Sequence, residues 1–319
     1  MNTQNIKPCP LFGKCGGCKL DFAAPDYQDK KLSFLKQATV TNEPIWLDIG
    51  NRRRADMAFV DGTIGFFAPH SHDVIPVKNC PLLTPGLNKI LPDLSKLNWT
   101  GGGSLLITEC DNGIDIAITA AAPYFPAEFG KSASKLSPIR ITWNDKNVKQ
   151  LVEPIIKFEN IYVKYPSGEF LQLSKIGEET ILNLIKKHIQ PDGKKIVDLF
   201  CGVGTFTLPL GADGFDIETN MNTRDLFKKP LSSGELKRYD AIVLDPPRIG
   251  ADKQSIQIAK LPSVADSKAK TVVYVSCNPD TFARDSKILI KGGWKLTDLT
   301  PIDQFVGSSH WELIGKFEK

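Results

Sequence analysis

Three cysteines stand close together near the start of the chain, in the stretch CPLFGKCGGCKL. Five residues, PLFGK, separate Cys9 from Cys15, and two glycines separate Cys15 from Cys18. Thiols spaced in this way can bind a metal centre, or they can be ordinary cysteines of an irregular N-terminal segment. The spacing alone leaves both interpretations open.

A further thiol ends a buried strand. The stretch TVVYVSC is apolar almost to Cys277, and polar residues with the start of a predicted helix follow it. A thiol at the mouth of a sheet is placed to act as a nucleophile, although an isolated cysteine is usually a structural one. We interpret Cys277 as a candidate nucleophile and Cys201, which lies inside a glycine turn, as structural.

Two other apolar strands, at 195–200 and 239–245, also end in unusual residues. The first runs into CGVGTF, where Gly202 and Gly204 would let a ligand approach the backbone closely. The dinucleotide-binding fingerprint has three glycines, whereas this turn has only two, which argues against NAD as the ligand. The second ends in DPPR, from Asp245, whose prolines either form the wall of a flat pocket or are only a stiff loop.

The final segment carries His310 and Glu312. Side chains two residues apart share one face of a strand, so both could point into one site. A lone glutamate on a last strand is more often a solvated edge residue, and only its neighbours make Glu312 a candidate.

The elements that must position these residues change in kind near residue 165. Two hairpins rich in β-branched residues are predicted before it, at 54–67 and 104–120. After it, an amphipathic helix at 178–190 alternates with the apolar strands, which are typical of sheets covered on both faces. The pattern predicts a doubly wound, Rossmann-like α/β domain preceded by a β-rich domain.

Composition limits the class of protein. The 319 residues are 41% hydrophobic and 24% charged, which is typical of a globular chain of about two domains. No apolar run approaches the roughly 18 residues of a membrane span, and the N-terminus lacks a signal peptide, so we expect a cytoplasmic protein. Its seven cysteines would then stay reduced, which favours metal binding or catalysis over disulfides.

The formal net charge of +4 permits a nucleic-acid partner without requiring one. The densest positive cluster is the run Arg52-Arg53-Arg54. We expect this run to be either a phosphate contact or a solvated strand edge.

Taken together, these motifs resemble the RNA uracil-5-methyltransferase family. The cysteine signature is similar to that of the iron–sulfur branch, which methylates uridines of 23S ribosomal RNA. Only eight residues precede Cys9, so we expect the small RNA-binding β-barrel of some relatives to be absent. The matching stretches follow the order of the family: CPLFGKCGGC, RRRADMAF, IGFFAPHSHDVIPVKNCPLL, FLQLS, DLFCGVGTFTLPL, DAIVLDPPRIGA, VVYVSCNPDTFARD and DQFVGSSHWE.

The resemblance implies a [4Fe–4S] cluster held by Cys9, Cys15, Cys18 and Cys80. From the residues alone, four thiolates can hold either zinc or an iron–sulfur cluster. Linking Cys18 to Cys80 would also fasten the N-terminal segment to the β-rich domain. Cys110, in a predicted hairpin, is expected to take no part.

The resemblance also implies methylation of carbon 5 of a uridine by S-adenosylmethionine. Cys277 would add to carbon 6 of the ring as the nucleophile, and Glu312 would be the base that removes the carbon 5 proton. The methyl donor would lie over DLFCGVGTF, in contact with Gln172, Phe200 and Asp245. Because both faces of the ring must be reached, the uridine has to leave its stack.

One region departs from the family pattern. The 29 residues 211–239 are fewer than the roughly 45 to 50 that two strands and two helices require. We expect the second strand and its helix to be missing near 211–218. Asp216 or Glu218 would then substitute for the acidic residue that binds the ribose of the donor, and Asp225 would lie near the adenine.

We therefore expect a monomer of three parts. These are an iron–sulfur segment at 1–40, a β-rich RNA-binding domain at 41–165 that supplies Cys80, and a methyltransferase domain at 166–319, shortened around 211–218. The expected substrate is 23S ribosomal RNA. Two alternatives stay open: an iron–sulfur RNA-binding protein of the same fold without turnover, and an enzyme acting on transfer RNA, against which the cysteine signature argues.

Overall fold

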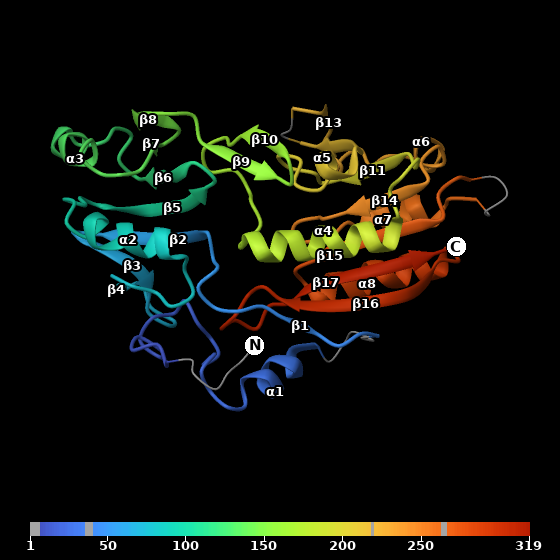
Figure 1. Ribbon diagram of the computed structural model, residues 1–319, viewed down its shortest axis with the longest axis horizontal. Coiled ribbons are helices and arrows are strands. Elements are labelled where there is room, and N and C mark those ends of the chain that lie inside the picture. Colours follow the sequence, from blue (N-terminus) through green and yellow to red (C-terminus); the bar gives the residue numbers. More distant parts are fainter. Residues whose placement is uncertain (1–6, 36–40, 218–219, 263–266) are drawn as a thin grey trace. The chain divides into compact units, whose positions relative to one another are not determined.

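The computed structural model describes residues 7–35, 41–217, 220–262 and 267–319 (Figure 1). The chain forms two compact units, and each is assembled from segments that lie far apart in the sequence. The first unit comprises Met1–Lys31, Asp48–Lys175 and Val306–Ser309, and the second comprises Leu32–Leu47, Ile176–Phe305 and His310–Lys319.

The first unit is rich in strands, as the sequence predicts. Both predicted hairpins are confirmed, with turns at Asp61-Gly62 and Asp111-Asn112. Its strands are β2 (Arg54–Val60), β3 (Thr63–Phe67), β4 (Val74–Pro76), β5 (Gly102–Cys110), β6 (Gly113–Ala120), β7 (Arg140–Trp143), β8 (Lys146–Gln150), β9 (Ile155–Phe158) and β10 (Ile161–Lys164). Within the described residues, seven of these form one sheet in the order β4-β3-β2-β5-β6-β7-β8, while β9 and β10 pair separately.

Helices α2 (Pro85–Leu94) and α3 (Ala127–Ala133) cover this sheet and close an aromatic core. The ring centroid of Phe59 lies 4.8 Å from that of Trp99 and 6.1 Å from that of Trp143. The Trp143 indole N–H donates to the carbonyl of Ala122 at 2.9 Å. Buried aromatic rings with a satisfied polar edge contribute strongly to a core, so this unit has its own hydrophobic interior.

The second unit contains the α/β sheet. Its strands are β1 (Ile45–Trp46), β11 (Ile196–Leu199), β12 (Asp213–Asp216), β13 (Asn222–Thr223), β14 (Ala241–Leu244), β15 (Thr271–Ser276), β16 (Lys295–Asp303) and β17 (Glu312–Glu318). Among the described residues the sheet has the order β1-β16-β17-β15-β14-β11-β12-β13. The pairs β12·β11, β11·β14 and β14·β15 are parallel, whereas β17 is antiparallel to both of its neighbours.

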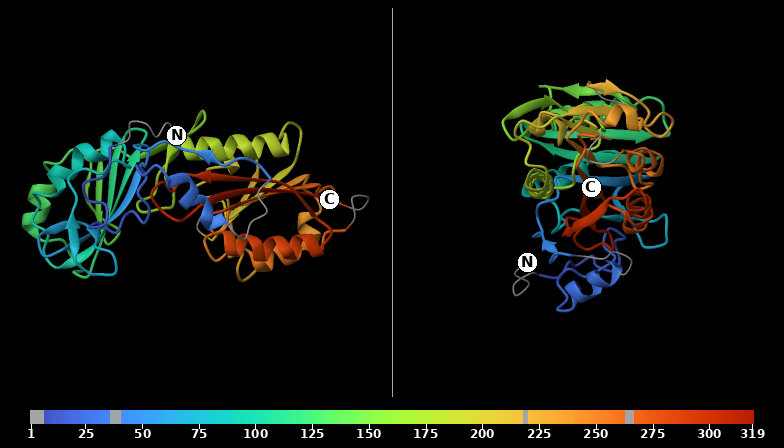
Figure 2. Two further views of the ribbon diagram at one scale, coloured as in Figure 1. Left: turned by 90° about the horizontal axis from the view of Figure 1, so that it is seen from below. Right: turned by 90° about the vertical axis from the view of Figure 1, so that its right-hand side faces the viewer.

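Helices lie on both faces of the second sheet, which confirms the doubly wound prediction. In β14, Ile242 and Leu244 enter the core shared with α8, whereas Ala241 and Val243 enter the core shared with α4. Figure 2 shows α4 and α8 on opposite sides of the strands. Besides α2 and α3, the helices in the described residues are α1 (Tyr27–Leu32), the 3-10 turn η2 (Ser33–Leu35), α4 (Lys175–Ile189), α5 (Thr207–Leu210), α6 (Ser233–Leu236), α7 (Asp252–Ala259) and α8 (Pro279–Lys291).

The shortened region keeps its strand, so the expectation of a missing second strand is wrong. β12 pairs in parallel with β11, with Val197 opposite Asp213. The chain can turn back at once because α5 ends after one turn at Gly211, whose φ of +59° is left-handed. Between β12 and β13 the described residues contain no helix, although a parallel crossover normally takes a dozen or more residues. Glu218 lies outside the described residues.

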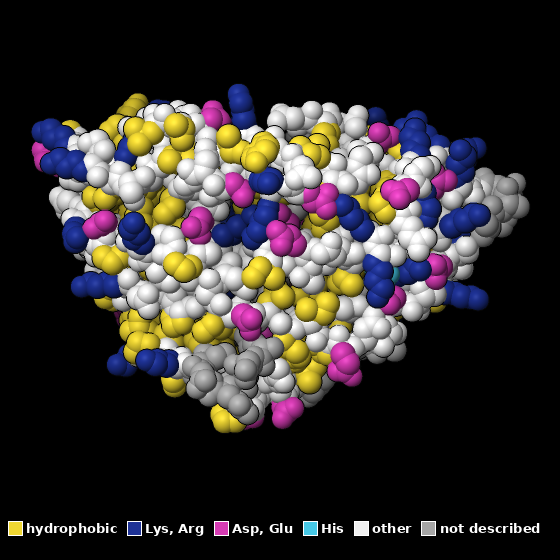
Figure 3. Space-filling model, viewed as in Figure 1, with side chains coloured by type: hydrophobic (Ala, Val, Ile, Leu, Met, Phe, Trp, Pro, Cys, Tyr) yellow, Lys and Arg dark blue, Asp and Glu magenta, His cyan; other side chains and the backbone are white. Residues whose placement is uncertain are grey.

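Basic and acidic side chains are interspersed on the face drawn in Figure 3, in keeping with the small formal net charge. None of the helices in the described ranges is long and apolar enough to cross a membrane.

Candidate active site

Cys277 directly follows β15, whose residues are all buried between the two helical layers. The Asn278 side chain caps α8 by accepting from the backbone N–H of Asp280 at 3.1 Å, and the Ser276 hydroxyl accepts from the N–H of Asn278 at 3.3 Å. The strand end and the helix start are thereby fixed on either side of the thiol. Cys277 itself is only half-buried, unlike the strand residues that precede it.

Strand register sets Glu312 beside this thiol. β15 and β17 run antiparallel with Ser276 opposite Leu313, so the next step along both strands leads to Cys277 and Glu312. Asp245 follows β14, the other neighbour of β15. The ends of three adjacent strands therefore bring together the nucleophile, the base and the first residue of DPPR that the sequence singled out.

The charges around Cys277 oppose ionisation of its thiol. Burial, followed by the negative charges of Glu312 and Asp245, raises the pKa of Cys277 to about 11. The positive charge of Arg248 acts in the opposite direction and lowers the pKa of Cys277. Arg248 therefore favours the thiolate, whereas burial and the two carboxyl groups disfavour it.

Glu312 is buried at the first position of β17, with 3% of its surface exposed. Burial, reinforced by the charge of Asp245, raises the pKa of the Glu312 carboxyl well above its ordinary value. The side-chain amide of Gln304 donates to its Oε2 at 2.5 Å. A carboxyl in this environment binds a proton firmly, which is the property required of a group that must remove one from carbon.

His310 does not share the strand with Glu312, contrary to the alternation argument. It precedes β17, and its ring lies 6.3 Å from that of Phe305. Residues two apart share a face only where both have extended strand backbone.

The glycine turn after β11 begins with a strained residue. Phe200 has a φ of +66°, which is uncommon for any residue with a side chain, and its N–H donates to the carbonyl of Phe215 at 2.9 Å. An added Cβ at Gly202 would meet no atom within 4 Å, so the space beside this glycine is open. The Gly202 N–H donates to Asp216 Oδ2 at 2.8 Å. Asp216 thus stands at the glycine turn, where a donor would be bound.

A second carboxyl lies near the same turn. Asp225 Oδ1 accepts from the backbone N–H groups of Phe227 and Lys228, each at 3.1 Å. Hydrogen bonds from Lys228 lower the pKa of Asp225, which therefore stays ionised. The Phe227 ring lies 5.3 Å from that of Phe200, so the Asp225 turn packs against the end of β11. No pattern in the sequence pointed to Phe227.

Gln172 belongs to the first unit, where the arginine run holds its segment. Arg53 Nε donates to the carbonyl of Gln172 at 3.1 Å, and Arg54 donates to that of Leu171 at 2.9 Å. Arg53 and Arg54 are buried, at 5% and 9% exposed. These two side chains form neither a solvated strand edge nor a phosphate contact, so both alternatives predicted from the sequence are wrong for Arg53 and Arg54. The buried guanidinium groups are stable there because backbone carbonyls accept their hydrogen bonds.

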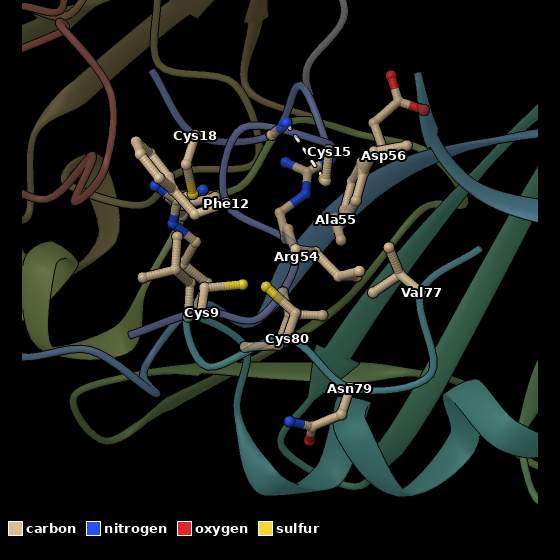
Figure 4. A pocket seen from close by; sticks show the side chains of 17 residues that line it. Cys9, Phe12, Cys15, Cys18, Arg54, Ala55, Asp56, Val77, Asn79 and Cys80 are labelled. Carbon is tan, nitrogen blue, oxygen red and sulfur yellow. Dashed lines mark hydrogen bonds between the residues drawn. The ribbon is translucent and has the colours of Figure 1, made fainter. Parts of the chain in front are cut away.

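The four cysteines predicted to bind a cluster line one cavity of about 230 Å³ in the first unit (Figure 4). Burial raises the pKa of Cys18 to about 12, with smaller upward contributions from Cys80, Cys15 and Cys9 and a downward one from Arg52. Cys110 does not line this cavity. In the described part of the chain, no group of three or more His, Cys, Asp or Glu side chains that could hold a metal ion is found.

The backbone around these thiols is held firmly. Asn88 on α2 accepts from the N–H of Cys80 at 2.8 Å and donates to its carbonyl at 3.0 Å. The Gly17 N–H donates to the Cys15 sulfur at 3.3 Å. Gly307 has a φ of +80°, and a Cβ there would lie 3.0 Å from the Cys18 sulfur, so the close approach favours glycine.

Known proteins share both the sequence and the fold. The profile of the family described as tRNA (Uracil-5-)-methyltransferase matches residues 216–317. An uncharacterised RNA methyltransferase of Rhizobium meliloti is 30% identical over 361 aligned residues, which cover 99% of this chain and 85% of the relative. One of Caulobacter vibrioides is 31% identical over 371, covering 100% and 87%.

The chain belongs to the RNA uracil-5-methyltransferase family.

Two further relatives of this family have named substrates. The 23S rRNA (uracil(1939)-C(5))-methyltransferase of Shewanella halifaxensis is 29% identical, with 99% of this chain and 83% of the relative covered. The tRNA (uracil-54, C5)-methyltransferase of Pyrococcus abyssi, solved with S-adenosyl-L-homocysteine, is 20% identical with a TM-score of 0.73, covering 98% of this chain and 88% of the other. This structural likeness confirms the mixed α/β methyltransferase fold with a β-rich N-terminal part.

The alignments to the family members exceed the 319 residues of this chain. These relatives therefore contain residues that this chain lacks, in agreement with a shortened sequence. Arg248 and Gln304 were not among the predicted site residues, although they belong to the stretches DPPR and DQFVGSSHWE. Neither motif indicates which of its side chains will lie near the end of a strand from a distant part of the sequence.

Replacing Glu312 by Gln should stabilise the protein at neutral pH. Because the folded-state pKa of Glu312 is raised, the unfolded chain releases a proton that the folded chain keeps, and native stability falls as the pH rises above the ordinary glutamate value. Gln keeps the shape and can still accept from Gln304. Thermal melting of the two proteins should coincide at about pH 4 and diverge toward about pH 8, with E312Q melting higher.

The matched control is Glu179→Gln, at an exposed position of α4, which should show no such divergence. Equal melting temperatures of the native protein and E312Q at about pH 8 would contradict a proton-holding Glu312.

Proposed function

We propose that this protein transfers the methyl group of S-adenosylmethionine to carbon 5 of a uridine in 23S ribosomal RNA. The observation that carries the proposal is the half-buried Cys277 thiol at the end of β15, with Glu312 and Asp245 close enough to change its pKa. A nucleophile and a proton-binding carboxyl on adjacent strands are the two groups that this reaction requires. The substrate named for the Shewanella relative supports ribosomal RNA.

In the proposed reaction the Cys277 thiolate adds to carbon 6 of the uracil ring. A carbon–sulfur bond forms, and the electron pair of the ring double bond moves toward the carbonyl to give an enolate. Carbon 5 of this enolate then takes the methyl group from the sulfonium of the donor. Glu312, after releasing its own proton to solvent, removes the carbon 5 proton as the carboxylate, the double bond re-forms, and the carbon–sulfur bond breaks to return the thiolate.

The methyl donor would bind at the glycine turn after β11. Open space beside Gly202 leaves room for it, and the Asp216 carboxylate next to that glycine has lone pairs left to accept the ribose hydroxyls. Asp225, ionised beside the Phe200–Phe227 ring pair, would lie near the adenine. Gln172 and Asp245 remain proposed donor contacts.

We propose that Cys9, Cys15, Cys18 and Cys80 hold a [4Fe–4S] cluster. Two observations support this proposal: the four thiols line one cavity, and the Arg52 cation beside them offsets the negative charge of four thiolates. When bound, the cluster would fasten residues 1–40 to the β-rich domain at 41–165, ahead of the methyltransferase domain at 166–319. The thiols must lose their protons to bind iron, so burial makes cluster assembly dependent on pH.

A 5-fluorouridine RNA should trap a covalent adduct with the native protein in the presence of S-adenosylmethionine. Fluorine cannot leave carbon 5 as the proton does, so elimination stops and Cys277 stays bonded to carbon 6. Cys277→Ala should form no adduct in denaturing gels and mass spectra. Cys110→Ala, a control at a thiol of the first unit that lies outside both proposed sites, should form it as the native protein does.

An adduct that persists in Cys277→Ala would refute the assignment of the nucleophile. The same assay distinguishes the substrates, because fluorouridine fragments of 23S ribosomal RNA should be trapped and fluorouridine transfer RNA should not. Trapping of transfer RNA alone would instead identify the transfer-RNA enzyme.

Isothermal titration should detect binding of S-adenosylmethionine, and Asp216→Ala should weaken it about tenfold or more, since a carboxylate that accepts hydrogen bonds from a ligand contributes about 1.5–3 kcal/mol. Glu179→Ala is the surface control. If the native protein binds no donor at about millimolar concentration but retains RNA, the shortened region has abolished turnover, and the protein is an RNA-binding member of the family.

Protein purified without oxygen should be brown and contain iron and sulfide in equal amounts. Cys80→Ser should lose most of this iron, whereas Cys110→Ser, at a thiol outside the cavity, should keep it. Stoichiometric zinc in a colourless native protein would rule out the iron–sulfur assignment.

A further inference from the structure

The loop from Asp245 to Ala251 presents one cation to the nucleophile. Arg248 is exposed on this loop, and its carbonyl accepts at 3.0 Å from the side chain of Asn278, the residue that follows half-buried Cys277. The charge of Arg248 lowers the pKa of the Cys277 thiol. Arginine keeps its charge at any working pH, so this cation is always present beside the thiol. The sequence suggested only a stiff wall for this segment.

Helix α8 clamps the backbone that carries Arg248. The side chains of Asn278 and Thr281 donate to the Arg248 carbonyl at 3.0 and 3.2 Å. One turn further along, Arg284 donates to the carbonyl of Ile249 at 3.0 Å. Asp285 accepts from the N–H of Ala251 at 2.7 Å, so the contacts continue along the helix to the end of the loop.

The clamp itself is rigid. Asp285 is fully buried and also accepts from the Tyr274 hydroxyl of β15 at 2.7 Å. An added Cβ at Gly250 would lie 2.7 Å from the same carboxylate, so the loop and the helix are in close contact. A long flexible arginine can hold one direction only if its backbone is fixed, and here the helix that follows Cys277 fixes it.

The charged groups that face the thiol are unequal in sign. Glu312 of β17 and Asp245 after β14 disfavour a thiolate, and Arg248 alone favours it. Gln304 and Asn278 nearby are neutral. The Arg284–Asp285 pair, at 2.8 Å, balances its own charge. Without Arg248, the largest remaining charge effects on the thiol would come from Glu312 and Asp245, which both oppose ionisation.

We propose that Arg248 is a catalytic residue that stabilises the thiolate of Cys277 and aims its sulfur toward the substrate, with Asn278 and Thr281 as positioning residues. This inference rests on the proposed role of Cys277 as nucleophile. The thiol proton leaves to solvent before the carbon–sulfur bond forms, and Arg248 keeps its own protons throughout. When the carbon–sulfur bond forms, the negative charge moves from the sulfur to the uracil ring, and the charge of Arg248 is no longer paired with the Cys277 sulfur.

The test is the rate at which iodoacetamide alkylates Cys277, followed by peptide mass spectrometry between about pH 7 and pH 10. Loss of the cation in Arg248→Gln should move the rate profile by about one pH unit to higher pH. A more basic thiolate is also more nucleophilic, which recovers about half of the effect, so alkylation at fixed pH should slow about threefold to tenfold. Arg248→Lys should restore part of the rate, and Arg238→Gln, at an arginine that bonds to Tyr239 instead, should match the native protein.

Salt supplies a second measurement on the native protein. Because Arg248 is exposed and Glu312 is buried, raising the ionic strength from about 0.05 to 1 M should weaken the cation more than the carboxylate. Alkylation by this uncharged reagent should therefore slow with salt in the native protein and not in Arg248→Gln. A profile of folded Arg248→Gln that coincides with the native one, or a native rate that does not respond to salt, would overturn the proposal.

Neither measurement contains RNA or methyl donor. A native protein that never forms the fluorouridine adduct would overturn the proposed function while the effect of Arg248 on the thiol could still be measured. Coincident alkylation profiles together with a normal adduct would overturn the role of Arg248 alone.

Discussion

The parallel pairing of β11, β14 and β15 is the constraint on which the candidate site depends. Leu199 lies opposite Leu244, and Leu244 opposite Tyr274, so the residues that follow each strand emerge at one edge of the sheet. Three motifs that are far apart in sequence become neighbours for this reason alone. The antiparallel β17 completes the group, because its first residue rather than its last faces that edge.

Burial at this edge has opposite consequences for two chemical roles. A carboxyl that must take a proton from carbon gains from a low-dielectric setting next to another acid, because its basicity rises. A thiol that must attack as an anion is hindered by the same neighbours. Glu312 and Cys277 lie on adjacent strands, so they cannot have separate electrostatic environments. The conflict explains why a cation fixed by the following helix matters at this site.

The shortened region shows which parts of a doubly wound unit can be lost. β12 keeps its place because a strand of four residues satisfies its backbone by pairing with β11, whereas a crossover helix needs many residues and a face to bury. The strand that remains still delivers an acidic residue to the glycine turn. The second unit therefore keeps the order of its strands, and what is reduced is the helix that would connect β12 to β13 across one face of the sheet.

The sequence by itself determined the local elements. Apolar runs predict β11, β14 and β15 because strands buried on both faces have no polar positions, and turn residues predict the two hairpins. It also identified Cys277, Glu312 and the cysteine cluster as candidates, because few residue types carry such chemistry. Only the tertiary structure decided which partners these side chains meet. Arg53 lies against a carbonyl of Gln172, Gln304 against Glu312, and Arg248 against Cys277. Each pair joins segments that contribute nothing to one another's local conformation, so the pairing depends on packing rather than on any pattern along the chain.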